Sequence, residues 1–333
     1  DKLGRPIAIL EAVNLPAKTV DLKLLLLYFI SVMDPIVNND YALVFIATKA
    51  TSDNRPPVEW LSTAYSMFNR KYKKNLKALY IIHPSRLVKL TLALVKPFIS
   101  AKFWKKVVSI EDINHVYRSI DRDQITFPNY VIRYNAKYSP PKPIFGTSLS
   151  SVLETERNPD GIPQVLQDCI EYLQDYMNVE GLFRQSGESA KINKIAKAYN
   201  FGEKVDFDDA DVHTVAGVLK KFLRDLADPL FPFEYYEVII QFNRMFSKDY
   251  ESLWIEKTNS IVSNFPTANV RTMKTLFPFL HEVSKYSSEN RMTASNLGTV
   301  LGPSIVRSEG IPSDMSELLE ANVVIEKFIL HHE

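Results

Sequence analysis

The chain has 333 residues, of which 46% are hydrophobic and 24% are charged. This composition excludes an intrinsically disordered chain, and the length exceeds one ordinary hydrophobic core, so two domains are expected. The single cysteine excludes an internal disulfide and favours a reducing, cytoplasmic location, with peripheral membrane attachment left open. The net charge of +1 hides an asymmetry, because residues 1–139 carry 21 Lys and Arg against 11 Asp and Glu, whereas the remainder carries 19 against 28. Opposite charges suggest that the two halves bind different partners or face each other. Alternatively, the charged side chains simply solvate two surfaces.

Strand and helix signals alternate along the first half of the chain. Apolar runs predict strands at residues 6–13, 41–48, 76–82 and 106–110. Apolar residues at helical spacing predict helices at residues 22–33, 57–69 and 86–100. This alternation indicates an α/β layer with a mainly parallel sheet. The longest apolar run, about ten residues, is short of the ~20 that span a bilayer.

A proline-dense segment separates the two halves, with the sequence SPPKP at residues 139–143. Prolines fix φ, remove backbone donors and favour an extended chain, so this segment is predicted to be a stiff connector. The predicted domains are therefore residues 1–138 and 145–333, joined by a linker at residues 139–144.

The second half has almost no strand signal and is predicted to be an all-helical bundle. Apolar residues at helical spacing predict helices at residues 162–177, 189–199, 213–226, 234–246, 250–263, 269–286, 293–301 and 314–331. The lone Cys169 has apolar neighbours in the first of these helices, so we expect it to pack in the core.

Three stretches of the second half hold the candidate functional residues: EGLFRQSG at 180–187, LKKFLRDLADPL at 219–230 and MTASNLGTVLGP at 292–303. Arg184 lies between two helices and beside glycines, so it is expected on an exposed loop, and its guanidinium suits phosphate oxygens. Lys220 and Arg224 are four apart and project from one helix face, and Asn296 is expected at the bundle edge. Taken singly, these residues could equally be a solvated charge, a solvated helix face and a helix cap.

Together, the three stretches resemble the RhoGAP domain, and the similarity extends over about residues 145–331. Their order and spacing match the family's G-x-F-R-x-S-G loop, K-x-x-L-R-x-L-x-x-P-L helix and M-T-x-x-N-L-x-x-V-x-G-P helix. One departure follows Gly302 and Pro303, where the family often has Asn-Leu and this chain has Ser304 and Ile305. This difference leaves Arg184 untouched but could alter local affinity for a partner.

The RhoGAP resemblance implies a role for each candidate residue. Arg184 would be an arginine finger, inserted in trans into the active site of a Rho-family small GTPase. Lys220 and Arg224 would form the GTPase-facing surface and brace the finger loop, and Asn296 would hold the GTPase switch region. Pro229, with the residues on either side of it, would end the helix and shape the docking edge.

The same resemblance implies that the chain is a GTPase activator that completes its partner's active site, and not an enzyme by itself. It would need no cofactor of its own, since the GTPase carries GTP and Mg²⁺. The six histidines show no metal-ligand spacing, so no metal site is expected. The chain also has neither a P-loop pattern nor a recognisable nucleophilic triad.

The first half resembles the BCH domain, a relative of the CRAL-TRIO lipid-binding fold, over about residues 1–135. The matching residues are DKLGRP at 1–6, DY at 40–41, NRKYKKNLKALYIIHP at 69–84, LVKPFIS at 94–100 and the 103–110 stretch. The resemblance implies binding of Rho GTPases, self-association as a homodimer and restraint of the neighbouring GAP domain. A CRAL-TRIO relative could instead enclose a lipid.

This half contains two basic clusters that are candidate binding surfaces. The first consists of Arg70, Lys71, Lys73, Lys74 and Lys77, and the second of Lys102, Lys105 and Lys106. They could attract an anionic membrane surface, pair with the acidic second half or with a GTPase, or form a solvated face. No nucleic-acid module surrounds them, so no nucleic-acid partner is expected.

The sequence favours a Rho GTPase activator and leaves two alternatives. One is a scaffold that docks a GTPase without accelerating hydrolysis, against which the presence of Arg184 argues. The other is a lipid-binding or lipid-transfer protein with secondary GAP activity.

Overall fold

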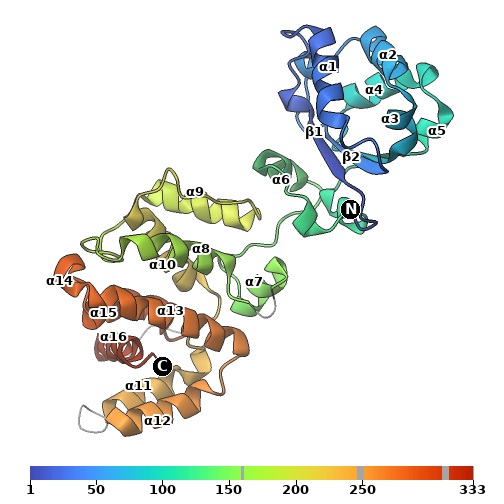
Figure 1. Ribbon diagram of the computed structural model, residues 1–333. Helices are drawn as coiled ribbons and strands as arrows, with labels where there is room; N and C mark the ends of the chain where they lie inside the picture. Colours follow the sequence, from blue (N-terminus) through green and yellow to red (C-terminus); the bar gives the residue numbers. More distant parts are fainter. Residues whose placement is uncertain (159–160, 246–250, 310–314, 333) are drawn as a thin grey trace. The chain divides into compact units, whose positions relative to one another are not determined.

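The computed structural model describes residues 1–158, 161–245, 251–309 and 315–332 (Figure 1). The chain divides into two compact units, Asp1–Pro140 and Pro141–Glu333. The first is an α/β layer and the second is a helical bundle, so the predicted fold class is confirmed. Within the described ranges, no helix is both long and apolar enough to cross a bilayer.

The first unit is built on a four-stranded parallel sheet with the order β1-β2-β3-β4. Its strands are β1 (Ile7–Glu11), β2 (Tyr41–Ile46), β3 (Leu76–Ile82) and β4 (Val107–Ile110). Parallel neighbours need a crossover between each pair of strands, and helices fill these connections. The crossover helices are α1 (Leu22–Met33), α2 (Val58–Met67), α3 (Arg70–Asn75), α4 (Arg86–Val95) and α5 (Ala101–Trp104).

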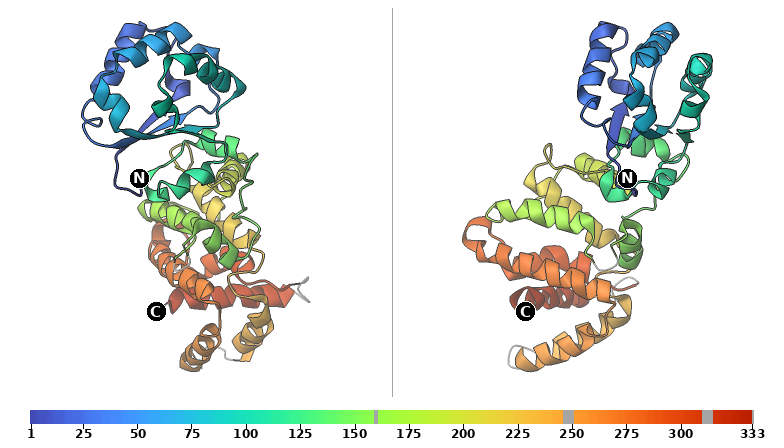
Figure 2. Two further views of the ribbon diagram at one scale, coloured as in Figure 1. Left: turned by 90° about the vertical axis from the view of Figure 1, so that its right-hand side faces the viewer. Right: turned by 45° about the vertical axis from the view of Figure 1, so that its right-hand side comes forward.

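The two faces of this sheet are covered differently. The crossover helices lie on one face (Figures 1 and 2), as expected when successive crossovers share one hand. The other face packs against α6 (Asn129–Asn135) and a 3-10 turn at Ile113–Arg118. On that side Val44 and Ile82 join Val116 and Val131 in a core with almost no exposed surface.

Several details of the first unit differ from the sequence prediction, and the strand expected at residues 41–48 ends at Ile46. The strand expected at residues 6–13 ends at Glu11, because the next residues turn into a short 3-10 helix. The helix expected at residues 86–100 ends at Val95, because Pro97 has no N–H to donate and a helical position there would be strained. Helix α3 was not predicted; Asn69 caps it by accepting a hydrogen bond from the Lys71 N–H.

The second unit packs its helices around one continuous core. They are α7 (Leu149–Glu156), α8 (Gln164–Leu173), α9 (Ser189–Asn200), α10 (Val212–Asp225), α11 (Tyr236–Met245), α12 (Glu251–Val262), α13 (Thr267–Lys285), α14 (Ser287–Asn290), α15 (Ala294–Ile305) and α16 (Met315–Leu330). Helix α10 contacts α8, α9 and α15, and therefore lies centrally in the bundle (Figure 1). Cys169 is fully buried in this core, as predicted.

The helix ends of this unit also differ from the prediction. Helix α8 begins only at Gln164, after Pro163, and its last turn tightens into a 3-10 helix. Helix α15 continues through Pro303 to Ile305, beyond the predicted end at residue 301. The helix ends predicted at residues 246, 250 and 314 lie outside the described residues.

Candidate functional site

The loop that carries Arg184 has an unusual backbone conformation. Gly181 has a φ of +71°, and Phe183 has a φ of +68°, which is uncommon and costly for a residue with a side chain. The Arg184 and Gln185 N–H groups both donate to the Gly181 carbonyl, at 2.8 Å each. The chain therefore turns sharply here and leaves Arg184 exposed.

Buried side chains anchor this loop immediately before the arginine. Leu182 and Phe183 have no exposed surface. The Phe183 ring meets the ring of Phe279 on α13 edge to face, with centroids 6.3 Å apart. This packing holds Phe183 in its left-handed conformation and fixes the point from which Arg184 projects.

Lys220 contacts the loop from helix α10. Its ammonium group donates to the Phe183 carbonyl over 2.9 Å. Burial, with the nearby positive charge of Arg224, lowers the pKa of Lys220 from its ordinary value. Helix α10 is oriented by its buried apolar stripe, which includes Val215, Leu219 and Phe222, so the position of Lys220 follows from the packing of that helix.

Asn290, at the end of α14, holds the loop from another side, and the sequence analysis did not single it out. Its side chain is fully buried and donates to the carbonyls of Met177 (2.7 Å) and Val283 (2.8 Å). Its side-chain oxygen accepts from the Met292 N–H at 2.6 Å, and its backbone carbonyl accepts from the Gly181 N–H at 2.8 Å. Asn290 therefore links the arginine loop to the segment that leads into α15.

The far end of the loop is held by the start of α10. A Cβ on Gly187 would lie 2.4 Å from the backbone of Thr214, so only glycine fits here. The Glu188 N–H donates to the Thr214 hydroxyl at 3.1 Å, and Thr214 itself bonds the N-cap residue Asp211. The glycine in the motif was visible in the sequence, whereas the contact with Thr214 was not.

Asn296 and Arg224 are the remaining candidate residues and lie on the helices α15 and α10. Asn296 is exposed and its side-chain amide donates to the Arg291 carbonyl at 2.8 Å. The Arg224 side chain is also exposed, one helical turn beyond Lys220. Arg307 fixes the end of α10, because its guanidinium donates to the carbonyls of Arg224 (3.0 Å) and Leu226. The contacts of Lys220 and Asn290 thus connect the elements bearing Arg184, Lys220 and Asn296.

Pro229 does not belong to an exposed contact surface. It is buried, and its carbonyl and that of Leu230 face the side-chain amide of Asn269 on α13, at 3.5 and 2.9 Å. A buried Pro229 offers little surface to a partner, and its assignment to the GTPase-binding residues stays a prediction. Helix α10 ends at Asp225, four residues before Pro229, so Pro229 does not end the helix itself.

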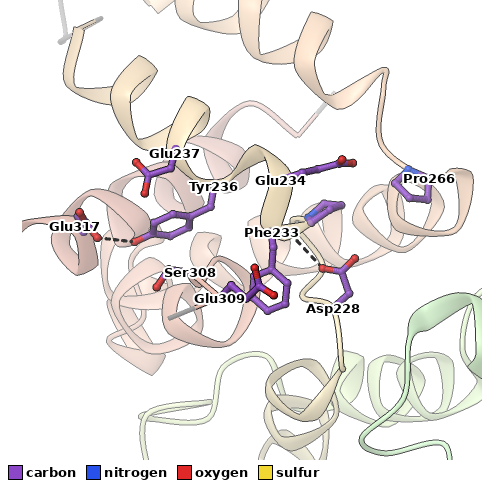
Figure 3. Close-up of a pocket in the computed structure, with 10 residues that line it drawn as sticks. Asp228, Phe233, Glu234, Tyr236, Glu237, Pro266, Ser308, Glu309 and Glu317 are labelled. Atoms are coloured by element: carbon purple, nitrogen blue, oxygen red, sulfur yellow. Dashed lines mark hydrogen bonds between the residues drawn. The ribbon is translucent and has the colours of Figure 1, made fainter. Parts of the chain in front are cut away.

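A concave region of this unit, separate from the arginine loop, is acidic (Figure 3). This hollow of about 740 Å³ lies beside α11 and α16, and five carboxylates line it: Asp228, Glu234, Glu237, Glu309 and Glu317. The Asp228 carboxylate accepts a hydrogen bond from the Phe233 N–H at 3.3 Å. Among the described residues, no group of three or more His, Cys, Asp or Glu could hold a metal ion.

The predicted basic surface of the first unit is partly neutralised by its own neighbours. Lys71 pairs with Asp34 at 2.6 Å, and Lys77 pairs with Asp40 at 3.2 Å. The Lys73 ammonium lies 4.6 Å from the centre of the Tyr65 ring. Arg70 and Lys74 are exposed, and neither makes such a contact within the part of the chain that the structure describes.

A cavity of about 1080 Å³ lies between the sheet of the first unit and its covering helices. Its wall includes Leu43 and Leu79 from the sheet, Phe29 from α1, and Ala64 and Val95 from α2 and α4. Most of the lining is aliphatic or aromatic. A cavity of this size and polarity suits an apolar ligand.

Comparison with known proteins assigns each of the two units to a domain family. Residues 163–310 match the RhoGAP domain, and residues 4–137 match the divergent CRAL/TRIO domain. The structure is similar to human Rho GTPase activating protein 15, with a TM-score of 0.55 and 31% identity, over 60% of this chain and 96% of that one. The fold thus defines a RhoGAP domain preceded by a divergent CRAL/TRIO domain, as the sequence resemblance predicted.

Two relatives extend over nearly the whole chain. Rho GTPase-activating protein gacY of Dictyostelium discoideum is 40% identical over 311 residues, covering 93% of this chain and 43% of the relative. Rho GTPase-activating protein 1 of Mus musculus is 33% identical over 354 residues, covering 100% of this chain and 80% of the relative. The chain therefore belongs to the Rho GTPase-activating protein family.

Proposed function

We propose that this chain accelerates GTP hydrolysis by a Rho-family small GTPase, with Arg184 as an arginine finger supplied in trans. Hydrolysis is slow when charge on the transferring phosphoryl group is not fully neutralised. A guanidinium beside this group stabilises the charge in the transition state, and such fingers accelerate hydrolysis by about 10³–10⁵. GTP and Mg²⁺ come with the partner, so the chain completes an active site that it does not contain.

One observation carries this proposal: Arg184 is exposed at the tip of a loop whose adjoining backbone is fixed. A finger must be held before it meets its target, because ordering a free loop during the reaction would consume part of the stabilisation. The contacts from Lys220, Asn290 and Thr214 supply this order. Arg224 and Asn296 are exposed, on the helices that Lys220 and Asn290 connect to the loop, and are the proposed GTPase contacts.

The test is single-turnover GTP hydrolysis by a panel of Rho-family GTPases, with the wild-type chain and Arg184→Ala. The variant is expected to keep most of its GTPase binding and to lose most of the acceleration, since the finger acts mainly in the transition state. Lys194→Ala, which removes an exposed positive charge from α9, is the control and should behave as wild type. Binding without acceleration by the wild-type chain would make it a scaffold instead.

The first unit has a second candidate function, lipid binding, which its apolar cavity favours. The other proposed roles of this unit are GTPase binding, self-association and restraint of the second unit, and they rest on the BCH resemblance. Mass spectrometry of lipids extracted from the purified full chain tests the lipid function. If no lipid copurifies and none is taken up from vesicles, lipid binding is excluded.

A further inference from the structure

The guanidinium group of Arg307 lies at the carboxyl end of helix α10. Arg307 follows the end of α15 by two residues, and its side chain is half-buried. It donates one hydrogen bond to the Arg224 carbonyl, at 3.0 Å, and another to the Leu226 carbonyl. The last carbonyls of a helix have no partner within the helix, and a positive charge is favourable at this end of the helix dipole. Arg307 therefore supplies both donors and charge to the end of α10.

The position of this guanidinium is itself fixed by the surrounding structure. An arginine presents its N–H groups in one rigid plane, so a single side chain can bond two carbonyls at once. The guanidinium carbon lies 5.6 Å from the centre of the Phe233 ring, within the range of a cation–π contact. Close by, the Phe231 N–H donates to the Ile305 carbonyl at 3.2 Å. The end of α15 is thus joined to α10 and to the segment that follows α10.

The contact with Arg307 acts on the last turn of α10, which carries Arg224. Lys220, one turn earlier, is held separately through its hydrogen bond to Phe183 in the arginine loop. The Arg224 side chain is 61% exposed and pairs with its sequence neighbour Asp225 at 3.2 Å. The Arg224 backbone, which determines where that side chain can reach, is bonded to Arg307.

We propose that Arg307 is a positioning residue for GTPase docking, which holds the last turn of α10 so that Arg224 projects toward the partner. The inference rests on the proposed function and deepens it, since it assigns this part of the site to affinity and not to the chemical step. Arg307 acts through the backbone of α10, because its guanidinium bonds two carbonyls there. Loss of this side chain should therefore weaken GTPase binding and leave the arginine finger intact.

The first test is single-turnover hydrolysis by a responsive Rho-family GTPase over a range of activator concentrations, with the wild-type chain and Arg307→Met. Methionine keeps the packing against Phe233 but has no N–H group to donate. The concentration for half-maximal stimulation should rise about three- to tenfold, whereas the rate at saturation should stay within about twofold of wild type. Urea unfolding followed by circular dichroism shows whether the variant is folded at the assay temperature.

A double-mutant cycle separates positioning of Arg224 from a general loosening of the bundle. In the Arg224→Ala background, Arg307→Met should cause little further loss of affinity, because the side chain that Arg307 positions is gone. Additive losses would overturn the proposal. Arg307→Lys keeps the charge but not the planar fork, so its affinity should be closer to that of Arg307→Met than to that of wild type. An affinity closer to wild type would mean that charge alone acts, and would also overturn the proposal.

The matched control is Arg244→Met. Arg244 also joins two helices through its guanidinium, which donates to the Ser316 hydroxyl at 2.8 Å, but it lies on α11. This variant should keep the affinity and the saturating rate of wild type. If it weakens binding as much as Arg307→Met does, the effect is not specific to α10 and the proposal fails.

Hydrogen exchange of the free chain gives a measurement that needs no GTPase. In Arg307→Met, the amides of residues 222–225 should exchange about tenfold faster than in wild type, whereas those of residues 214–218 should not change. Unchanged exchange at residues 222–225 would overturn the proposal. The two possible failures are distinguishable in the hydrolysis assay. If wild type stimulates no GTPase, the proposed function fails; if wild type stimulates hydrolysis and Arg307→Met matches it at every concentration, this inference alone fails.

Discussion

The ammonium group of Lys220 donates a hydrogen bond to the carbonyl oxygen of Phe183, 2.9 Å away. That carbonyl belongs to the peptide bond that joins Phe183 to Arg184, and the N–H of the same peptide donates to Gly181 at 2.8 Å. Both polar groups of this peptide are therefore fixed. The orientation of the arginine backbone is set before any partner arrives.

Replacement of Lys220 by methionine keeps the length and packing of the side chain but removes the hydrogen bond to Phe183. A hydrogen bond to a charged group contributes about 1.5–3 kcal/mol, so the stimulated hydrolysis rate should fall about ten- to hundredfold. Single-turnover hydrolysis at saturating activator measures this loss. The control is Lys221→Met, at the residue next to Lys220 on α10. It breaks the ion pair between Lys221 and Asp225 and should leave the rate near wild type. Equal rates for the two variants would contradict a bracing role for Lys220.

Asn290→Ala is expected to lower the free energy of unfolding of the second unit by about 3 kcal/mol, because three buried hydrogen-bonding groups lose their partner. Urea unfolding followed by circular dichroism measures the change. Asn296→Ala changes an exposed side chain, so it should barely alter the free energy of unfolding, but it should weaken GTPase binding. If both variants unfold like wild type, Asn290 does not hold the loop in the way described.

The buried carboxyl group of Glu156 should make the stability of the second unit fall as pH rises. Burial, with the Asp168 charge adding to it and the Gln164 N–H opposing it, raises the pKa of Glu156 from 4.5 to about 7. The folded protein therefore holds this proton up to about pH 7, whereas the unfolded chain releases it near 4.5. The stabilisation is complete below pH 4.5 and is lost as pH rises through 7.

Thermal unfolding of wild type and Glu156→Gln across this pH range tests the prediction. The variant cannot lose a proton here, so its stability relative to wild type should rise between about pH 5 and 8. Glu171→Gln, at an exposed position on α8, serves as the matched control and should track wild type. A constant difference between Glu156→Gln and wild type would mean that Glu156 is ionised normally.

Removal of the first unit is expected to raise GAP activity if that unit restrains the second. The basic first half and the acidic second half motivate this expectation, together with the BCH resemblance. Residues 141–333 should stimulate hydrolysis about fivefold or more above the full chain at low salt, with a smaller difference at high salt. Identical rates for the two proteins at every salt concentration would rule out restraint.

Much of the architecture could be predicted because local pattern and tertiary burial agree. The apolar run at residues 76–82 became β3, and the apolar stripe at residues 213–226 became α10. The errors lie mainly at element ends, where single residues decide the outcome. Pro97 ended α4 early, whereas Pro303 did not end α15, and only the surrounding packing separates these two cases.

The sequence by itself determined the two-part organisation, the helical and strand periods, and which three stretches carry Arg184, Lys220 and Asn296. These properties follow from residue order, because the period of the apolar residues and the spacing of the motifs are local features of the sequence. The tertiary structure decided which loop atom Lys220 bonds, that Pro229 is buried, and that Asn290 joins segments far apart in sequence. Asn290 and its acceptor Met177 are 113 residues apart in the sequence. Contacts at such separations depend on how helices pack against one another, so no local sequence pattern predicts them.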